Sequence, residues 1–237
     1  MICSIHQPNF FPWLGYFNKI YNSDIFVILD DVEYPKSGNS MSSWVNRVAI
    51  NINNEAHWIS CPIVREHGKQ KICDISINNN NEWKNKLIKT LEYNYKKSDY
   101  YHETADFIFQ LLDYEVGKLS DLNCYVIEKM CKKLELETHF IKQTDLQTQC
   151  KSNNLLIEIT KKVECDTYMC GGGASGYQED ALFKEYGINL LYQNYKHPVY
   201  KQKNDVFIEG LSIIDVLFNC GFTGTKQLIM ENKRKSC

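Results

Sequence analysis

The sequence lacks the segments that direct a protein into or across a membrane. No apolar run in its 237 residues approaches the roughly 20 that span a bilayer. The first six residues, Met1 to His6, contain neither the basic nor the apolar stretch of a secretory signal. Internal repeats and long linkers are also missing. We therefore expect a cytoplasmic protein, not associated with membranes, that forms a single domain over residues 1–237.

Clustered cysteine and histidine ligands are missing as well, although the chain has ten cysteines. They are scattered, with no Cys-x-x-Cys pair and no cysteine–histidine group at zinc spacing. Scattered cysteines in a cytosolic chain are usually small buried hydrophobic residues, so we expect free thiols and no bound metal. The formal charge of −2 provides no excess of positive charge for a broad nucleic-acid surface. A tRNA partner is therefore not favoured, whereas a local basic pocket for a nucleotide diphosphate is compatible with the sequence.

The start of the chain predicts a βαβ unit. A short strand over residues 2–6 is followed by a loop rich in proline and aromatic residues and then by a helix over 13–21. The next run, residues 25–29, is continuously apolar, which is typical of a strand covered on both faces of a parallel sheet. The last third of the chain returns to this alternation. Strands are expected over 138–142, 166–170 and 188–192, and helices over 153–162, 179–186 and 211–218.

Between these two parts the pattern changes. Residues 40–77 contain three short β-like runs, 44–52, 57–64 and 71–77, with a hairpin signal at Asn53-Asn54. We read this segment as an antiparallel β insertion on the main sheet. A helical segment over 82–134 follows, with helices expected over 82–97, 102–112 and 119–134. The predicted fold is α/β: a mainly parallel, Rossmann-like central sheet with flanking helices and an antiparallel β insertion.

Polar side chains follow the first predicted strand, at the place where ligands bind in α/β sheets. His6, Gln7 and Asn9 lie in an otherwise apolar segment made rigid by prolines. They are candidates for substrate binding, with His6 as a catalytic base. The alternative is a structural loop in which the imidazole of His6 bonds to backbone.

The end of the second predicted strand and the segment after it supply further candidates. Asp30, before Asp31, could hold a substrate amine, and Tyr34 lies close by in the sequence. Trp44, Asn46 and Arg47 suit the recognition of a phosphate or carboxylate, because a guanidinium forms paired hydrogen bonds with such groups. A solvated strand end and an ordinary surface arginine are the structural alternatives.

A glycine-rich turn follows the predicted strand 166–170. Its candidate ligand-binding residues are Gly171, Gly172, Gly173, Ser175 and Tyr177. Such a turn between a strand and a helix lets backbone amides approach a phosphate. It matches neither the Walker A motif nor the dinucleotide fingerprint, and glycines also serve ordinary tight turns.

The last candidates lie near the C-terminus. His197 precedes a proline and is flanked by Tyr195 and Tyr200, an arrangement suited to a general base or to stacking on a ring. Ser212 and Asp215 begin the predicted closing helix. The alternatives are a structural histidine and an aspartate that only holds a neighbour in place. The strands predicted over 2–6 and 188–192 precede these two histidines and are expected to be parallel members of one sheet. We therefore expect His6 and His197 to face one cleft.

Taken together, these segments resemble the WbqC-like protein family over nearly the whole chain. The resemblance is carried by His6-Gln7-Pro8-Asn9-Phe10-Phe11-Pro12-Trp13-Leu14-Gly15-Tyr16-Phe17, by Asp24 with Phe26 to Asp30, by Ser43 to Arg47, by Thr167 to Tyr177 and by Tyr195 to Gly221. The opening is also similar to the nucleotidylyltransferase start of strand, loop and a Gly-His on a helix. Here Gly15-Tyr16 stands at that place, and Tyr16 is a further candidate for substrate contact.

The resemblance implies a place among the enzymes of O-antigen and capsule biosynthesis. Some family members look like transferases that put an amino acid, such as glycine, on the amine of a nucleotide-linked amino sugar. The function we expect is therefore N-acyl or N-aminoacyl transfer, with an ATP-activated amino acid, an acyl thioester or an aminoacyl-tRNA as the donor. The alternatives are an ATP-dependent adenylyl or nucleotidyl transferase and a non-catalytic binding module of a glycan assembly complex.

Overall fold

The computed structural model describes residues 1–35, 43–79, 82–171, 179–203 and 206–231. The helices are α1 (Leu14–Tyr21), α2 (Trp83–Tyr95), α3 (Tyr101–Asp113), α4 (Leu119–Lys133), α5 (Gln143–Leu146), α6 (Ser152–Lys162), α7 (Asp180–Glu185) and α8 (Ile213–Met230), with a 3₁₀ turn η1 (Ile72–Asp74). The strands are β1 (Ile2–His6), β2 (Ile25–Ile28), β3 (Arg47–Ile52), β4 (Glu55–Ser60), β5 (His139–Lys142), β6 (Thr167–Cys170) and β7 (Asn189–Tyr192). The predicted helices and main-sheet strands are thus confirmed, most of them to within one or two residues at each end.

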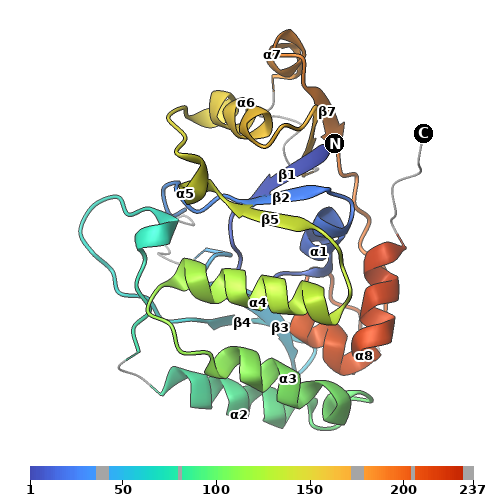
Figure 1. Ribbon diagram of the computed structural model, residues 1–237. Helices are drawn as coiled ribbons and strands as arrows, with labels where there is room; N and C mark the ends of the chain where they lie inside the picture. The colour runs from blue at the N-terminus through green and yellow to red at the C-terminus, as the bar shows by residue number, and fades with distance from the viewer. Residues whose placement is uncertain (36–42, 80–81, 172–178, 204–205, 232–237) are drawn as a thin grey trace.

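A parallel sheet forms the centre of the fold. Its strand order is β5-β2-β1-β6-β7, and each neighbouring pair is parallel. Helices α6 and α7 lie on one side of it, and α1 and α4 lie on the other (Figure 1). The α/β fold with a mainly parallel sheet is therefore confirmed.

Alternate side chains of β2 enter two different cores, which explains its continuously apolar sequence. Val27 packs with α6 and α7, whereas Phe26 and Ile28 belong to the larger core on the opposite side. Because a strand presents successive side chains to opposite faces, only a strand covered on both sides needs apolar residues at every position. The larger core continues into the helical segment α2–α4 and into α8.

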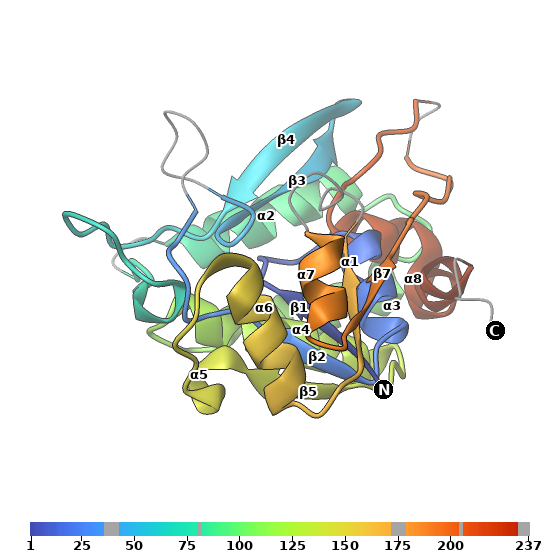
Figure 2. The ribbon, with the colours of Figure 1, turned by 90° about the horizontal axis from the view of Figure 1, so that it is seen from above.

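The insertion differs from the prediction in two respects. Strands β3 and β4 form their own two-stranded antiparallel sheet instead of extending the main sheet, and in Figure 2 they lie at the rim of the molecule. Their turn is the predicted one: Asn53 and Asn54 have φ angles of 52° and 68°, as in a tight hairpin turn. The strand predicted over 71–77 is wrong. This segment forms η1 and makes only isolated bridges, such as Ile63 with Ile77.

The closing helix is longer than predicted, because α8 continues to Met230 across a kink at Gly221, whose φ is 66°. A Cβ atom at this glycine would lie 2.6 Å from the Tyr100 ring. Both the left-handed backbone and the close packing therefore require glycine. Within the described parts of the chain, no helix has the combined length and apolar character that crossing a membrane requires.

Candidate functional site

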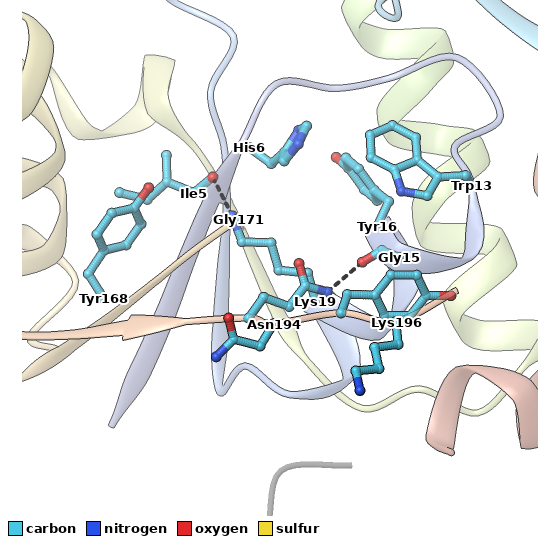
Figure 3. A pocket seen from close by; sticks show the side chains of 12 residues that line it. Ile5, His6, Trp13, Gly15, Tyr16, Lys19, Tyr168, Gly171, Asn194 and Lys196 are labelled. Carbon is cyan, nitrogen blue, oxygen red and sulfur yellow. Dashed lines mark hydrogen bonds between the residues drawn. The ribbon is translucent and has the colours of Figure 1, made fainter. Parts of the chain in front are cut away.

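A cavity of about 930 Å³ opens at the carboxyl ends of β1 and β6 (Figure 3). It is lined by Ile5, His6, Trp13, Gly15, Tyr16, Lys19, Tyr168, Gly171, Gln193, Asn194, Tyr195 and Lys196. In the sheet, β1 pairs with β2 on one side and with β6 on the other, so the strand order reverses between β1 and β6. Crevices at such a reversal are where open α/β sheets bind their ligands. The fold therefore provides a binding site at the end of β1, where the sequence places His6.

His6 enters the cavity as a neutral imidazole. Its ring packs against those of Trp13 and Tyr16, with ring centroids 6.1 and 4.8 Å away. Nδ1 lies 3.0 Å from the carbonyl oxygen of Gln7, which assigns the proton to Nδ1 and leaves the lone pair on Nε2. Burial and the positive charge of Lys19 lower the pKa of His6 to about 3. The ring is therefore neutral at pH 7, and it is a weak base while Lys19 is charged.

Lys19 is the functional candidate that the sequence analysis missed. Its side chain is 3% exposed, and Nζ donates to the carbonyl oxygen of Ile5 at 3.1 Å, as Figure 3 shows. Burial lowers the pKa of Lys19 to about 8. Among the described residues no carboxylate lies within ion-pair distance of it. A buried cation without an opposing charge is costly, so the site is suited to an anionic ligand.

The sequence contained one signal for Lys19. In the predicted helix over 13–21, Lys19 stands among the apolar residues Leu14, Phe17 and Ile20. A lysine in such a setting must either reach solvent or be buried. Only the depth of the packing decides between these two outcomes. Helix α1 is the next element after β1, and its Lys19 side chain lines the cavity at the end of that strand.

The segment after β7 forms the opposite wall and is fastened to α1. The Gln193 amide donates to the carbonyl oxygen of Gly15 at 2.8 Å and to Oδ1 of Asn18 at 3.0 Å. The Tyr195 ring then lies against Gly15. The hydroxyl of Tyr195 is buried and has no hydrogen-bond partner within the described residues.

Replacing Gly15 by alanine should therefore deform the cavity. The added Cβ atom would lie 2.8 Å from Nε1 of Trp13 and 2.9 Å from Cδ1 of Tyr195. Since both rings are packed, we expect a loss of roughly 1 to 3 kcal/mol of unfolding free energy, as for other overpacked sites. Denaturant titration measures it. An unchanged unfolding free energy would mean that the two rings can move apart without cost.

Of the candidate residues that follow β1, some line the cavity and others do not. The carbonyl oxygen of Gln7 accepts both from His6 and from the Tyr16 hydroxyl, the latter at 3.0 Å. Tyr16 lines the cavity as expected, whereas Asn9 is buried and not among the lining residues. Gln7 thus positions two cavity side chains through its backbone.

Asp30, Tyr34 and Asn46 have structural partners instead of lining the cavity. The Asp30 carboxylate accepts from the amide and hydroxyl of Thr144, at 3.1 and 3.2 Å, and so holds the start of α5. Burial raises the pKa of Asp30, although these hydrogen bonds oppose the shift. The Tyr34 hydroxyl donates to Oδ1 of Asn46 at 2.8 Å, and the Asn46 amide donates to the carbonyl oxygen of Cys61. The assignment of Asp30 to a substrate amine therefore has no geometric support.

Tyr200, Ser212 and Asp215 likewise lie in the core near the start of α8, away from the cavity lining. The buried Asp215 carboxylate accepts from the hydroxyls of Tyr95 and Tyr200, each at 2.7 Å. Ser212 caps α8, because its hydroxyl accepts from the amide of Ile214 at 3.2 Å and donates to the carbonyl oxygen of Phe11. These groups fix α8 and offer nothing to the cavity.

His197 lies next to the cavity wall without lining it. Its ring packs against Tyr195 and Phe207, with centroids 5.8 and 6.0 Å away, and its Nε2 atom is buried without a partner among the described residues. His6 and His197 therefore do not line one cavity as expected, and the residue that lines it at this point is Lys196. Of the glycine-rich candidates, Gly171 lines the cavity; Gly172, Gly173, Ser175 and Tyr177 lie outside the described residues.

Trp44 and Arg47 do not line the cavity: Trp44 lies in the turn before β3, and Arg47 is the first residue of β3. Trp44 contacts the cavity residue Trp13 on one side and Trp58 on the other, with ring centroids 5.2 and 5.0 Å apart. The Arg47 guanidinium carbon lies 4.4 Å from the centre of the Trp58 ring. The arrangement is a continuous line of aromatic rings that begins at the cavity.

Comparison with known proteins places nearly the whole chain in one family. The sequence model of the WbqC-like protein family matches residues 7–227. The chain is also similar to the uncharacterized protein Rv1507c of Mycobacterium tuberculosis, at 29% identity over 221 residues, which cover 92% of this chain and 93% of that protein. No solved structure matches the chain. The match begins directly after β1 and includes α1 and the wall segment after β7, so most of the cavity lining lies within the matched region, whereas Ile5 and His6 lie just before it.

Proposed function

The chain belongs to the WbqC-like protein family, and we propose that it is a transferase of surface-polysaccharide biosynthesis. It moves an acyl or aminoacyl group, such as glycyl, to the amine of a nucleotide-linked amino sugar. The observation that carries this proposal is Lys19, a buried cation that lacks a carboxylate partner within the described residues and faces a cavity at the strand-order reversal. The diphosphate of a sugar nucleotide would supply the missing negative charge.

The reaction needs a neutral amine and an activated carbonyl. The ammonium group of the sugar loses a proton to a base, and the neutral amine nitrogen attacks the carbonyl carbon of a thioester, an acyl phosphate or an aminoacyl ester. A C–N bond forms, the carbonyl oxygen carries the negative charge of the tetrahedral intermediate, and the leaving group departs with its electron pair. The nitrogen gives up its second proton to the solvent or to the leaving group as the tetrahedral intermediate collapses. Nε2 of His6 is the base in this scheme, and Lys19 stabilises the anionic groups.

Substrate binding itself would prepare His6 for this role. Part of the lowering of the His6 pKa comes from the charge of Lys19. A diphosphate beside Lys19 offsets that charge, so the pKa of His6 rises when the ligand is bound and the imidazole becomes a stronger base. The free enzyme thus holds a weak base, and the complex a stronger one.

Replacing His6 by asparagine should reduce turnover by a factor on the order of 10² or more, the usual loss when a general base is removed. The variant should fold, because an amide still reaches the Gln7 carbonyl. The assay follows N-acylation of a nucleoside diphosphate amino sugar with a thioester or with ATP and an amino acid. His197→Asn is the matched control, since His197 does not line the cavity. Equal losses in both variants would contradict the assignment of the base.

A second candidate function is adenylyl or nucleotidyl transfer. It is favoured by the strand order β5-β2-β1-β6-β7 together with a loop and helix directly after β1. One observation speaks against this function: Tyr16 stands where the nucleotidylyltransferases whose opening this chain resembles carry a phosphate-binding histidine. Release of pyrophosphate from ATP with an amino acid present, but without any acylated sugar, would favour this second function.

A further inference from the structure

The outer face of the β3–β4 hairpin carries an exposed aromatic surface next to the cavity. We call it the tryptophan platform; it consists of Trp44, Trp58 and Arg47. Trp44 and Trp58 are 41% and 49% exposed, and they are large side chains that a folded protein normally buries. The position of Trp58 on this face follows from the pairing register, in which Ala49 lies opposite Trp58 while Val48 and Ile50 point into the core.

The platform is built rigidly, although it is exposed. The backbone of Trp44 is held by a hydrogen bond from the amide of Phe10 to its carbonyl oxygen, at 2.9 Å. The ring of Trp44 is held between Trp13 and Trp58. Ala49, 6% exposed, leaves room for the Trp58 ring above the strand. An exposed aromatic surface that is fixed in this way loses little conformational entropy when a flat ligand stacks on it.

Arg47 adds an unpaired cation to this surface. Its guanidinium lies over Trp58, and among the described residues it forms no ion pair. Its Nε atom is buried without a hydrogen-bond partner there. The planar guanidinium over Trp58 extends the flat surface on which a base can stack.

From these observations we propose that the tryptophan platform binds the nucleobase of the nucleotide whose diphosphate Lys19 holds. This inference rests on the proposed function and places the two ends of that substrate: the amino sugar in the cavity, and the base beyond Trp13 on the hairpin. Flat bases stack on aromatic side chains whatever their identity. The binding energy of the base is then available to hold the sugar at His6, far from the part of the substrate that stacks.

The experiment measures binding of UMP, AMP and ribose 5-phosphate to the full chain by calorimetry. Ribose 5-phosphate is the base-free control. We expect UMP to bind more tightly than ribose 5-phosphate, and Trp58→Ala to weaken UMP about tenfold or more, as for a lost stacking contact. Trp58→Phe should restore most of the affinity. Arg47→Met should weaken UMP and leave ribose 5-phosphate unchanged, whereas Tyr93→Ala, which removes an exposed ring on α2, should change neither.

The outcomes separate this inference from the proposed function. Equal affinity of the wild type for UMP and ribose 5-phosphate would overturn the platform proposal. So would a Trp58→Ala variant whose UMP affinity is unchanged, including one in which only the self-association of the protein changes. If acyl transfer to a sugar nucleotide is found and Trp58→Ala leaves its KM unchanged, the platform fails while the function stands. If UMP or AMP stacks as expected and no transfer occurs, the platform stands while the function fails. Preference for AMP over UMP would point to ATP as the nucleotide bound there.

Discussion

Replacing Lys19 by methionine should stabilise the protein and at the same time abolish its activity. Methionine fills a similar volume without a charge. We expect the free energy of unfolding at pH 7 to rise by roughly 1 to 3 kcal/mol, the cost of a buried cation less one lost hydrogen bond to the Ile5 carbonyl. Turnover and affinity for a nucleoside diphosphate amino sugar should both fall by about 10² or more, because the diphosphate loses its buried partner. Opposite changes in stability and activity are characteristic of a functional charge and not of a structural one.

The pH dependence of stability identifies Lys19 as the source of this effect. The pKa of Lys19 is about 8 in the folded protein, against an ordinary value of 10.5. Between these values the unfolded chain binds more protons than the folded one, so the stability of the wild type rises with pH. The difference in unfolding free energy between Lys19→Met and the wild type should be largest below pH 8 and should disappear as pH rises through 10.5.

Denaturant titration of both proteins between pH 6 and 11 measures this difference. Lys196→Met is the matched control: Lys196 also lines the cavity but is exposed, so its removal should not stabilise the fold. A Lys19→Met variant that is less stable than the wild type at pH 7 would contradict the account of Lys19 as an unpaired buried cation.

Asp215→Ala should be the most destabilising change outside the site. It removes the acceptor of two buried tyrosine hydroxyls, those of Tyr95 and Tyr200, and leaves both without this partner. Breaking a buried charged network in this way typically costs about 3 to 5 kcal/mol of unfolding free energy. Tyr200→Phe removes only one of the two hydrogen bonds and should cost about 1.5 to 3 kcal/mol. Equilibrium unfolding in denaturant measures both.

The milder variant Asp215→Asn decides whether this residue is structural or functional. If the structural role is right, the folded variant binds a nucleoside diphosphate amino sugar as tightly as the wild type does. The pKa of Asp215 is raised by burial, so the folded state holds a proton more tightly than the unfolded state. The stability of the wild type relative to Asp215→Asn should therefore fall as pH rises from 3.8 through the folded pKa. A loss of ligand affinity without loss of stability would return Asp215 to the binding site.

The fold could be predicted from sequence wherever the pattern depended on local chemistry. The run 25–29 needed apolar residues at every position because two cores meet at β2, and Asn53-Asn54 needed a left-handed turn. The strand predicted over 71–77 failed because Cys73, Ile75 and Ile77 alternate as in a strand, whereas the buried isoleucines Ile72, Ile75 and Ile77 pack from η1 and isolated bridges. Apolar spacing indicates burial, and it does not by itself fix the backbone.

The site was predictable only in part, for a related reason. His6 follows from its place at the end of β1, which topology alone fixes. Asp30, Asn46 and Asp215 carry the same chemical groups as binding residues, yet their partners, such as Thr144 and Cys61, lie far away in the sequence. Lys19 differs from a surface lysine only in its depth. Long-range partners and burial depth are properties of the packed chain, and no local motif contains them.

The central claim is that the cavity at the end of β1 binds the diphosphate of a sugar nucleotide through Lys19. Calorimetry with a nucleoside diphosphate amino sugar and with the free amino sugar tests it most directly, on the wild type and on Lys19→Met. The account predicts that the wild type binds the nucleotide-linked sugar at least 10² times more tightly than the free sugar, and that most of this difference is lost in Lys19→Met. Equal affinity of the wild type for both ligands, or an undiminished difference in Lys19→Met, would contradict it.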